Sequence, residues 1–320
     1  GKNSYRSENQ MPGEGETFLG RLDWKHKNLL VNGSYFNLQN RVTEPLFDVL
    51  SIPGLALRRR QRAQNGQISL VYTPGNRFSN TLRLGGQRLT SNNHKGYPDF
   101  FRTSAESFGF KFSAYEANAP TLPGVSILDH SGFERLRVTP SPTYELSAQT
   151  AFQIRNDVSY RRRDFVFRGG VMWRRGIWPF LNSENLAGSF IFSSLAFRGS
   201  RNGTADFLMG IPASYRITTP RSMNLRWHEF AAYGEAEWRP LRGLKITTGL
   251  RYEIQPPAVE RLDRIAAFRR DVESQSFEDT LPNLIFPGDP DGEFGPLPRS
   301  TVRTHGRHLV PRIGVTYAPS

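Results

Sequence analysis

Apolar and polar residues alternate over long stretches of this chain, most clearly between Trp227 and Ile254. In the second half of this stretch, Leu244 to Ile254, every second residue is apolar or Thr, and the residues between are polar or Gly. A period of two residues predicts a β-strand with one apolar and one polar face. Pro240 and Gly243 predict a tight turn just before it. The whole stretch therefore predicts an antiparallel hairpin.

The same alternation predicts nine long strands. A tilted strand needs about 9 to 11 residues to cross a membrane, whereas strands of soluble sandwiches usually have about 5 to 6 residues. The predicted lengths therefore favour the wall of a membrane barrel. The predicted strands are residues 16–24, 28–38, 66–73, 79–90, 143–158, 164–174, 226–238, 244–254 and 309–317.

The connections between these strands alternate between short and long. In an antiparallel meander every second connection lies at the same end, and outer-membrane barrels have short periplasmic turns and long extracellular loops. We predict an all-β chain, residues 1–320, that forms part of an antiparallel transmembrane β-barrel; the alternative is a soluble β-sandwich whose loop lengths alternate by chance. The long connections are 39–65, 91–142, 175–225 and 255–308, and the short ones lie near 25–27, 74–78, 159–163 and 239–243.

The pleat also predicts which residues face lipid. In the strand at 143–158 the even-numbered residues are mainly apolar, and in the strand at 164–174 the odd-numbered ones are. We assign these sets to lipid and the intervening residues, including Arg168 and Arg174, to the lumen. Aromatic residues near strand ends are typical of the girdles at the two membrane interfaces. The predicted girdle residues are Trp24, Trp173, Trp238 and Tyr252.

Charge is the main compositional feature. The net charge is +13, and only 6 of the 42 basic residues are Lys. Arginine suits bidentate contact with carboxylate and phosphate, so ion pairs in the lumen and loops, lipopolysaccharide, or an anionic substrate could each account for it. Nucleic acid is the rival partner, but the arginines are spread along the whole chain without a nucleic-acid-binding motif. We therefore expect no nucleic-acid partner.

No pattern in the chain predicts catalysis, a cofactor or a metal site. Phosphate-binding loops, G-x-S-x-G and H-E-x-x-H are absent from the sequence, and so is cysteine. His305 and His308 stand in loop-like sequence. Asp289, Asp291 and Glu293 lack the remaining ligand positions of a calcium loop, so we expect a solvated turn there. A transmembrane helix is also excluded, because no run of eighteen apolar residues occurs. We expect that the chain is not an enzyme.

The candidate functional residues are charged. One set shares the predicted lumen face, where the residues should form ion pairs across neighbouring strands. The other is a dense cationic patch in the predicted extracellular loop 39–65, where a charge run is usually a solvated loop. The lumen set is Arg83, Arg155, Arg168, Glu229, Glu235, Arg251, Glu253 and Arg312, with Arg21, Asp23, Asp157 and Glu237. The loop patch is Arg58, Arg59, Arg60 and Arg62.

Several motifs resemble the barrel of Oar-like TonB-dependent outer-membrane transporters. They are AYGEAEWRPLRGLKITTGLRYE, PPAVERLDRIAAF, VPRIGVTYAP, TADFLMGIPASY and FVFRGGVMWRR. The resemblance implies a barrel in the bacterial outer membrane, a plug seated on the lumen charges, and import of a bulky ligand powered by the TonB complex. It also implies that the long loops determine which ligand is bound.

The sequence shows no plug, no TonB box and no signal peptide. We therefore expect the chain to be the barrel portion of a longer receptor, whose N-terminal region would contact the TonB complex. Two alternatives stay open. A surface adhesin would use the same loops without active transport, and a soluble basic binding module would lack the lipid-facing band.

Overall fold

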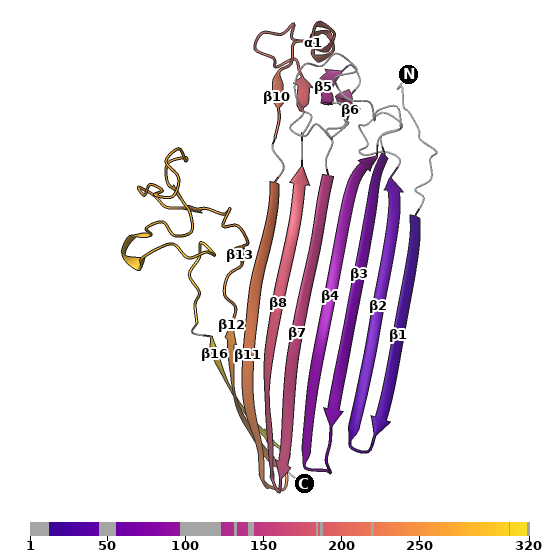
Figure 1. The fold of residues 1–320 in the computed structure, drawn as a ribbon, viewed down its shortest axis with the longest axis vertical. Coiled ribbons are helices and arrows are strands. Elements are labelled where there is room, and N and C mark those ends of the chain that lie inside the picture. Colours follow the sequence, from indigo (N-terminus) through magenta and orange to yellow (C-terminus); the bar gives the residue numbers. More distant parts are fainter. Residues whose placement is uncertain are drawn as a thin grey trace.

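The computed structural model describes residues 13–44, 56–96, 123–130, 133–139, 144–183, 185, 188–218, 221–306 and 308–318. Nine long antiparallel strands lie side by side and form a curved sheet (Figure 1). They are β1 (Gly13–His26), β2 (Leu29–Glu44), β3 (Ala56–Tyr72), β4 (Phe78–Gly96), β7 (Tyr144–Arg162), β8 (Phe165–Ser183), β11 (Arg221–Leu241), β12 (Leu244–Ile254) and β16 (Leu309–Tyr317).

The nine predicted strands are confirmed in number, order and pairing. Neighbours in the sheet follow chain order, as a meander requires. Most strands are longer than predicted, and β11 reaches 21 residues. The sheet is open, because β1 and β16 each pair on one side only among the described strands. No helix in the described part of the chain is long and apolar enough to cross a membrane.

Tight turns join the strands at one end of the sheet, at the positions predicted. The turn between β11 and β12 depends on Gly243, whose φ is 78°. A Cβ on Gly243 would clash with the carbonyl oxygen of Ala318, whose own N–H donates to the Gly243 carbonyl at 2.8 Å. Glycine is favoured here because a side chain would be strained in this backbone conformation.

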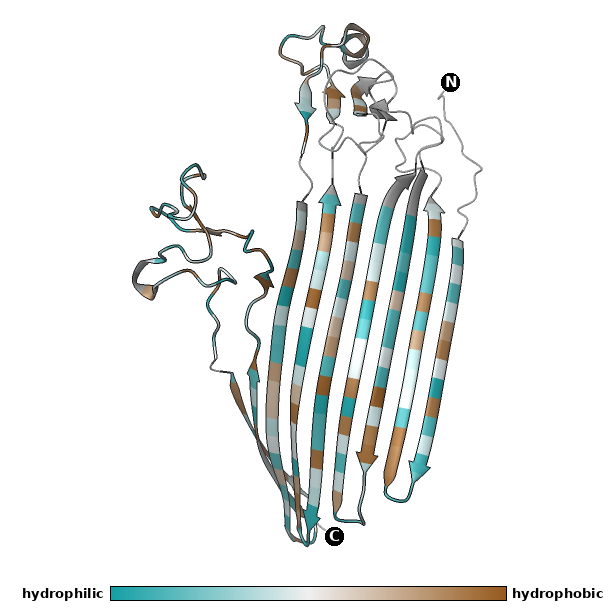
Figure 2. Cartoon of the chain, viewed as in Figure 1, coloured by the Kyte–Doolittle hydropathy of each residue, from teal (hydrophilic) through white to brown (hydrophobic). Residues whose placement is uncertain are grey.

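The register divides the residues between an apolar and a polar face, as predicted. Hydrophobic and hydrophilic segments alternate along the strands in Figure 2. Trp24 and Trp238 lie near strand ends, but Trp173 lies in the middle of β8, because this strand continues to Ser183. The girdle assignment of Trp173 was therefore wrong. One row of paired residues on the apolar face is Ile68, Leu84, Ile154, Trp173, Phe230 and Ile254.

A second, smaller sheet lies beyond the long-loop end of the strands (Figure 1). It contains β5 (Gly124–His130), β6 (Phe133–Thr139), β9 (Ser189–Phe192) and β10 (Ser214–Arg216), beside the helix α1 (Gly203–Met209). Asn202 caps the start of α1, and Gly210 ends the helix with φ 71°.

The loop from 255 to 308 is folded around small elements of its own. β13 (Val259–Glu260) pairs with β11, β14 (Ala267–Phe268) pairs with β15 (Leu284–Ile285), and the 3-10 helix η3 spans Gly292–Phe294. Ala267, Ile285 and Leu297 form a buried apolar cluster. The loop therefore has a core and is anchored to the edge of β11.

Candidate functional site on the polar face of the sheet

The polar face of the large sheet carries all the predicted lumen residues. Side chains alternate between faces, and directly paired residues share a face. Arg83 pairs with Arg155, and Glu235 with Arg168. Glu229 lies opposite Arg174, and Arg251 opposite Tyr233. The register therefore gathers these charges on one surface, opposite to the apolar face.

Asp157 is the centre of the first charge cluster. Its carboxylate accepts hydrogen bonds from Arg83 Nη1 at 3.0 Å, Arg155 Nε at 2.8 Å and the Tyr233 hydroxyl at 2.9 Å. Gly170 lies between Asp157 and Tyr233 in the register, and a Cβ there would approach Asp157 Oδ1 to 2.7 Å. Glycine thus leaves the space in which the tyrosine reaches the carboxylate.

Arg168 is the centre of the second cluster. Its Nη1 lies 3.0 Å from Glu235 Oε1 and 3.3 Å from Glu237 Oε2. Arg239 reaches Glu237 at 2.8 Å, and Arg312 lies 3.6 Å from Glu235. Glu237 is only 6% exposed, so its charge is held by two guanidinium groups where little water reaches it. The cluster links β8, β11 and β16 across the polar face.

The remaining ion pairs on this face lie outside the two clusters. Arg174 Nη1 lies 3.6 Å from Glu229 Oε2 and joins β8 to β11. Arg251 pairs with Glu253 along β12, and Asp23 accepts from both Arg21 and Asn32. The predicted cross-strand pairs are therefore present, but several ion pairs join residues two apart on one strand.

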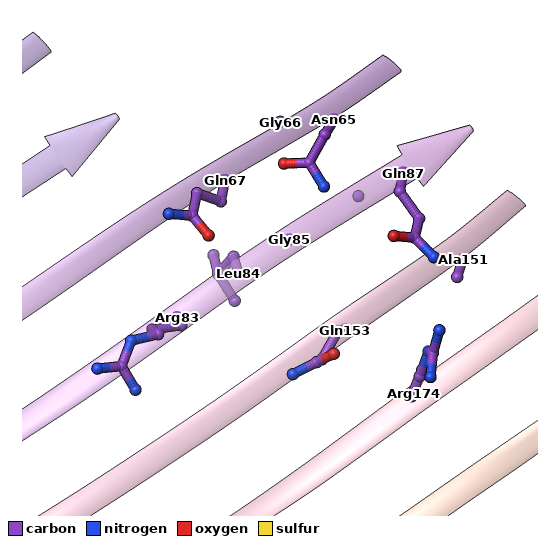
Figure 3. Close-up of a pocket in the computed structure, with 11 residues that line it drawn as sticks. Asn65, Gly66, Gln67, Arg83, Leu84, Gly85, Gln87, Ala151, Gln153 and Arg174 are labelled. Atoms are coloured by element: carbon purple, nitrogen blue, oxygen red, sulfur yellow. The ribbon is translucent and has the colours of Figure 1, made fainter. Parts of the chain in front are cut away.

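A polar hollow of about 140 Å³ lies on the same face between β3, β4, β7 and β8. Figure 3 shows amide side chains and two arginines from these neighbouring strands around it. Such amides both donate and accept hydrogen bonds, so the hollow suits a polypeptide backbone or another neutral polar group. Its polar side chains are Asn65, Gln67, Gln87, Gln153, Arg83 and Arg174. Sequence reasoning assigned Gln153 to the lumen face but named none of these amides as a candidate, and it placed Asn65 in a loop.

A comparison with protein families shows which family the chain belongs to. Residues 1–320, the whole chain, match the family described as outer membrane beta barrel domain. The chain belongs to this family. A search among curated proteins finds no match. Membership in the outer membrane beta barrel family implies the bacterial outer membrane, where the apolar face of the wall contacts lipid and the polar face lines the lumen.

The predicted loop patch needs a correction. Arg58, Arg59, Arg60 and Arg62 belong to β3, which pairs with β2 and β4 throughout this region. The strands continue beyond the apolar band, where the alternation of apolar and polar residues stops. The interpretation of residues 39–65 as one loop was therefore wrong for 39–44 and 56–65.

The turn at Asp289 and Asp291 also differs from the prediction. Asp289 is 1% exposed and accepts from the hydroxyls of Ser274 and Ser276. Asp291 binds the guanidinium groups of Arg269 and Arg303. Both carboxylates are therefore buried inside the loop and not solvated. No group of three His, Asp or Glu within the described ranges could hold a metal ion.

Glu260 anchors the same loop to the barrel wall and was not predicted. Its buried carboxylate accepts from the backbone N–H groups of Asn224, Leu262 and Arg264 and from the Arg264 guanidinium. Burial by itself raises the pKa of Glu260, but these four donors outweigh burial and lower it to about 2. The motif PPAVERLDRIAAF thus supplies both the acid and its arginine.

Proposed function

We propose that the chain is the barrel portion of an Oar-like TonB-dependent receptor that binds a bulky ligand and imports it across the outer membrane. The proposal draws support from where the resembling motifs fall. AYGEAEW contributes Tyr233, Glu235 and Glu237 to the lumen clusters, and VPRIG contributes Arg312. The residues that carry the resemblance are thus residues that line the lumen. We propose no catalytic role.

The observation that carries the proposal is the composition of the lumen wall. Paired charges and an amide-lined hollow cover it over several strands. A water-filled pore needs no such hollow. The backbone of a protein plug could form hydrogen bonds with the amides, and charged residues of the plug could pair with the clusters. A plugged lumen cannot pass a bulky solute by diffusion, so import needs energy from the TonB complex, which would reach the plug from the periplasmic side.

The experiment uses the full-length protein in cells with and without the TonB complex. Uptake should be lost without the complex, whereas surface binding of ligand should persist. Replacing Arg168 and Arg251 by Ala should loosen the plug and raise leakage of large antibiotics. The matched control replaces the exposed loop residues Arg198 and Arg201 by Ala and should not leak. Undiminished uptake without the complex would indicate a passive pore and refute the proposal.

One observation favours a second candidate, a surface adhesin. The segment around α1 exposes large apolar side chains at the far end of the structure: Phe197 is 98% exposed and Leu195 88%. Leu208 and Met209 of α1 are exposed as well. Exposed apolar groups of this kind mark surfaces that bind partners. If cells adhered through this segment and took up no ligand, and if Phe197→Ser abolished adhesion, the adhesin would replace the transporter.

A further inference from the structure

We propose that the lipid-facing side of β2, β3 and β4 binds a lipopolysaccharide molecule. The headgroup phosphates would contact Arg41, Arg60, Arg62 and Arg88, and an acyl chain would occupy the apolar groove directly below them. The proposal depends on the outer-membrane location of the barrel and is independent of any role in transport.

The four arginines lie close together on one face. Arg41 of β2 is directly opposite Arg60 of β3, whereas Arg62 and Arg88 are opposite Gln39 and Gln64. All four arginines are exposed. Like charges directly opposite each other destabilise a sheet. An anion between these strands would remove that repulsion.

Few carboxylates of the protein compensate this cluster. Glu14 reaches Arg41 only at 3.9 Å, and Arg62 donates to the neutral Asn37 side chain at 2.8 Å. Glu16 lies opposite Gln39 at the β1 edge, and Arg88 lies opposite Thr150 on β7. Neither Arg60 nor Arg88 makes an ion pair or a side-chain hydrogen bond with any residue that the structure describes. The cluster therefore has an excess of positive charge.

The cluster lies at the long-loop edge of the apolar band. Gln64 of β3 pairs with Arg88 of β4, and its side chain donates to the Tyr35 hydroxyl at 2.7 Å. Two residues closer to the tight turns, the same face carries Gly66 on β3 and Gly86 on β4. The arginines therefore stand on the extracellular side of the lipid-facing residues, at the height of the outer-leaflet headgroups. That leaflet carries lipopolysaccharide, whose phosphates match the fork of an arginine side chain.

Below the arginines a groove of about 880 Å³ crosses the wall. It is lined by glycines and bordered by aromatic rings, and its surface is mainly apolar. A Cβ on Gly33 would meet no atom within 4 Å, so the groove has free space there. The apolar-face lining residues that matter are Gly20, Gly33, Gly66, Gly86, Tyr35 and Phe152. A groove of this kind beside a cationic cluster fits a lipid with a charged head and an apolar chain.

The test measures lipopolysaccharide that co-purifies with the full-length protein from outer membranes in mild detergent. The double variant Arg60→Gln/Arg88→Gln should retain less, by about fivefold for each arginine removed. Arg59→Gln/Arg163→Gln removes the same charge from the opposite face of β3 and from the turn after β7, and should retain the wild-type amount. Heat-dependent gel mobility checks that each variant is folded. Equal retention in both variants would overturn the proposal.

Two further measurements separate the headgroup from the acyl chain. Binding of lipid A to the purified protein should weaken as its phosphates are removed, and inorganic phosphate alone should compete poorly. Gly33→Leu should fill the groove and weaken lipid A binding while leaving all four arginines in place. Full competition by inorganic phosphate, or normal binding to Gly33→Leu, would show an anion site without a lipid site and refute the proposal.

Discussion

The arginines on the two faces of the barrel wall differ in what they contact. On the lumen face Arg83, Arg155 and Arg168 each end on a carboxylate within about 3 Å. On the lipid face, above the apolar band, Arg60 and Arg88 find no such carboxylate in the described structure. The two groups have the same residue type and meet on β4, which carries both Arg83 and Arg88, yet only one group is neutralised by the protein itself. Pairing with a carboxylate, and not charge alone, therefore distinguishes structural arginines from those that are open to a ligand.

The largest expected effect comes from placing a charge on the lipid face of the wall instead of the lumen face. Ile154→Asp places a charge on the lipid face, whereas Gln153→Asp places it on the adjacent lumen position. A charge at mid-membrane depth costs about 2 to 4 kcal/mol for the most unfavourable residues and less for Asp, but a lumen position stays hydrated. Ile154→Asp should therefore lower the free energy of unfolding much more, measured by urea titration in lipid vesicles. Equal losses would mean that the faces are assigned wrongly.

The next test removes the acid from a lumen cluster. Asp157→Asn leaves Arg83 and Arg155 without their shared carboxylate and should cost about 1 to 3 kcal/mol of unfolding free energy. Asp23→Asn removes an acid from a more exposed pair and should cost about 1 kcal/mol or less. The same urea titration measures both. If Asp23→Asn proved the costlier change, burial would not control the strength of these clusters.

A third test uses pH on the loop that Glu260 anchors. The pKa of Glu260 is lowered from about 4.5 to about 2, so its contribution to stability is present above about pH 4.5 and is lost as the pH falls towards 2. Hydrogen exchange over residues 259–264, corrected for intrinsic rates, should speed up in that window.

The control for this test is Glu260→Gln, in which the segment should exchange fast at every pH. Asp289, whose pKa is also lowered to about 2, responds in the same window but lies in another part of the loop. Exchange over 259–264 that depends on pH equally in the variant would assign the effect to another group.

The smallest expected effect has the opposite sign. Arg60→Gln removes the repulsion with Arg41 across β2 and β3, so in detergent free of lipopolysaccharide it should raise the unfolding free energy by about 0.2 to 1 kcal/mol. With lipopolysaccharide added, the wild-type protein should gain stability and the variant should gain less. A loss of stability in clean detergent would show that Arg60 already has a partner.

Alternation predicted the fold well because half of each strand faces lipid. Ile154 and Gln153 follow each other in the sequence but meet different surroundings, so every second residue is constrained. The alternation ends where the strands extend beyond the apolar band. Arg58 to Arg62 lie beyond the apolar band, and their place in β3 depends on pairing with β2 and β4, which no local pattern records.

The candidate site was predicted only in part, because contacts between strands leave no local pattern in the sequence. The lumen face of Arg168 and Glu235 followed from the pleat, but their mutual distance depends on the register between β8 and β11. The burial of Glu260 and Asp289 could not be predicted, because a buried acid in a loop is recognisable only once its donors, such as Arg264 and Ser276, fold around it.

The unequal lengths of β11 and β12 give the barrel rim a step. Phe230 pairs with Ile254, the last residue of β12, and β11 continues for nine more residues to Arg221, a rise of about 30 Å along the strand. The rim of the described wall is therefore lowest at β12 and at β16, whose first residue Leu309 pairs with Tyr252, and β13 fastens the loop to β11 above it. The loop held by the Glu260 carboxylate therefore covers the side of the wall where β11 has no β12 partner.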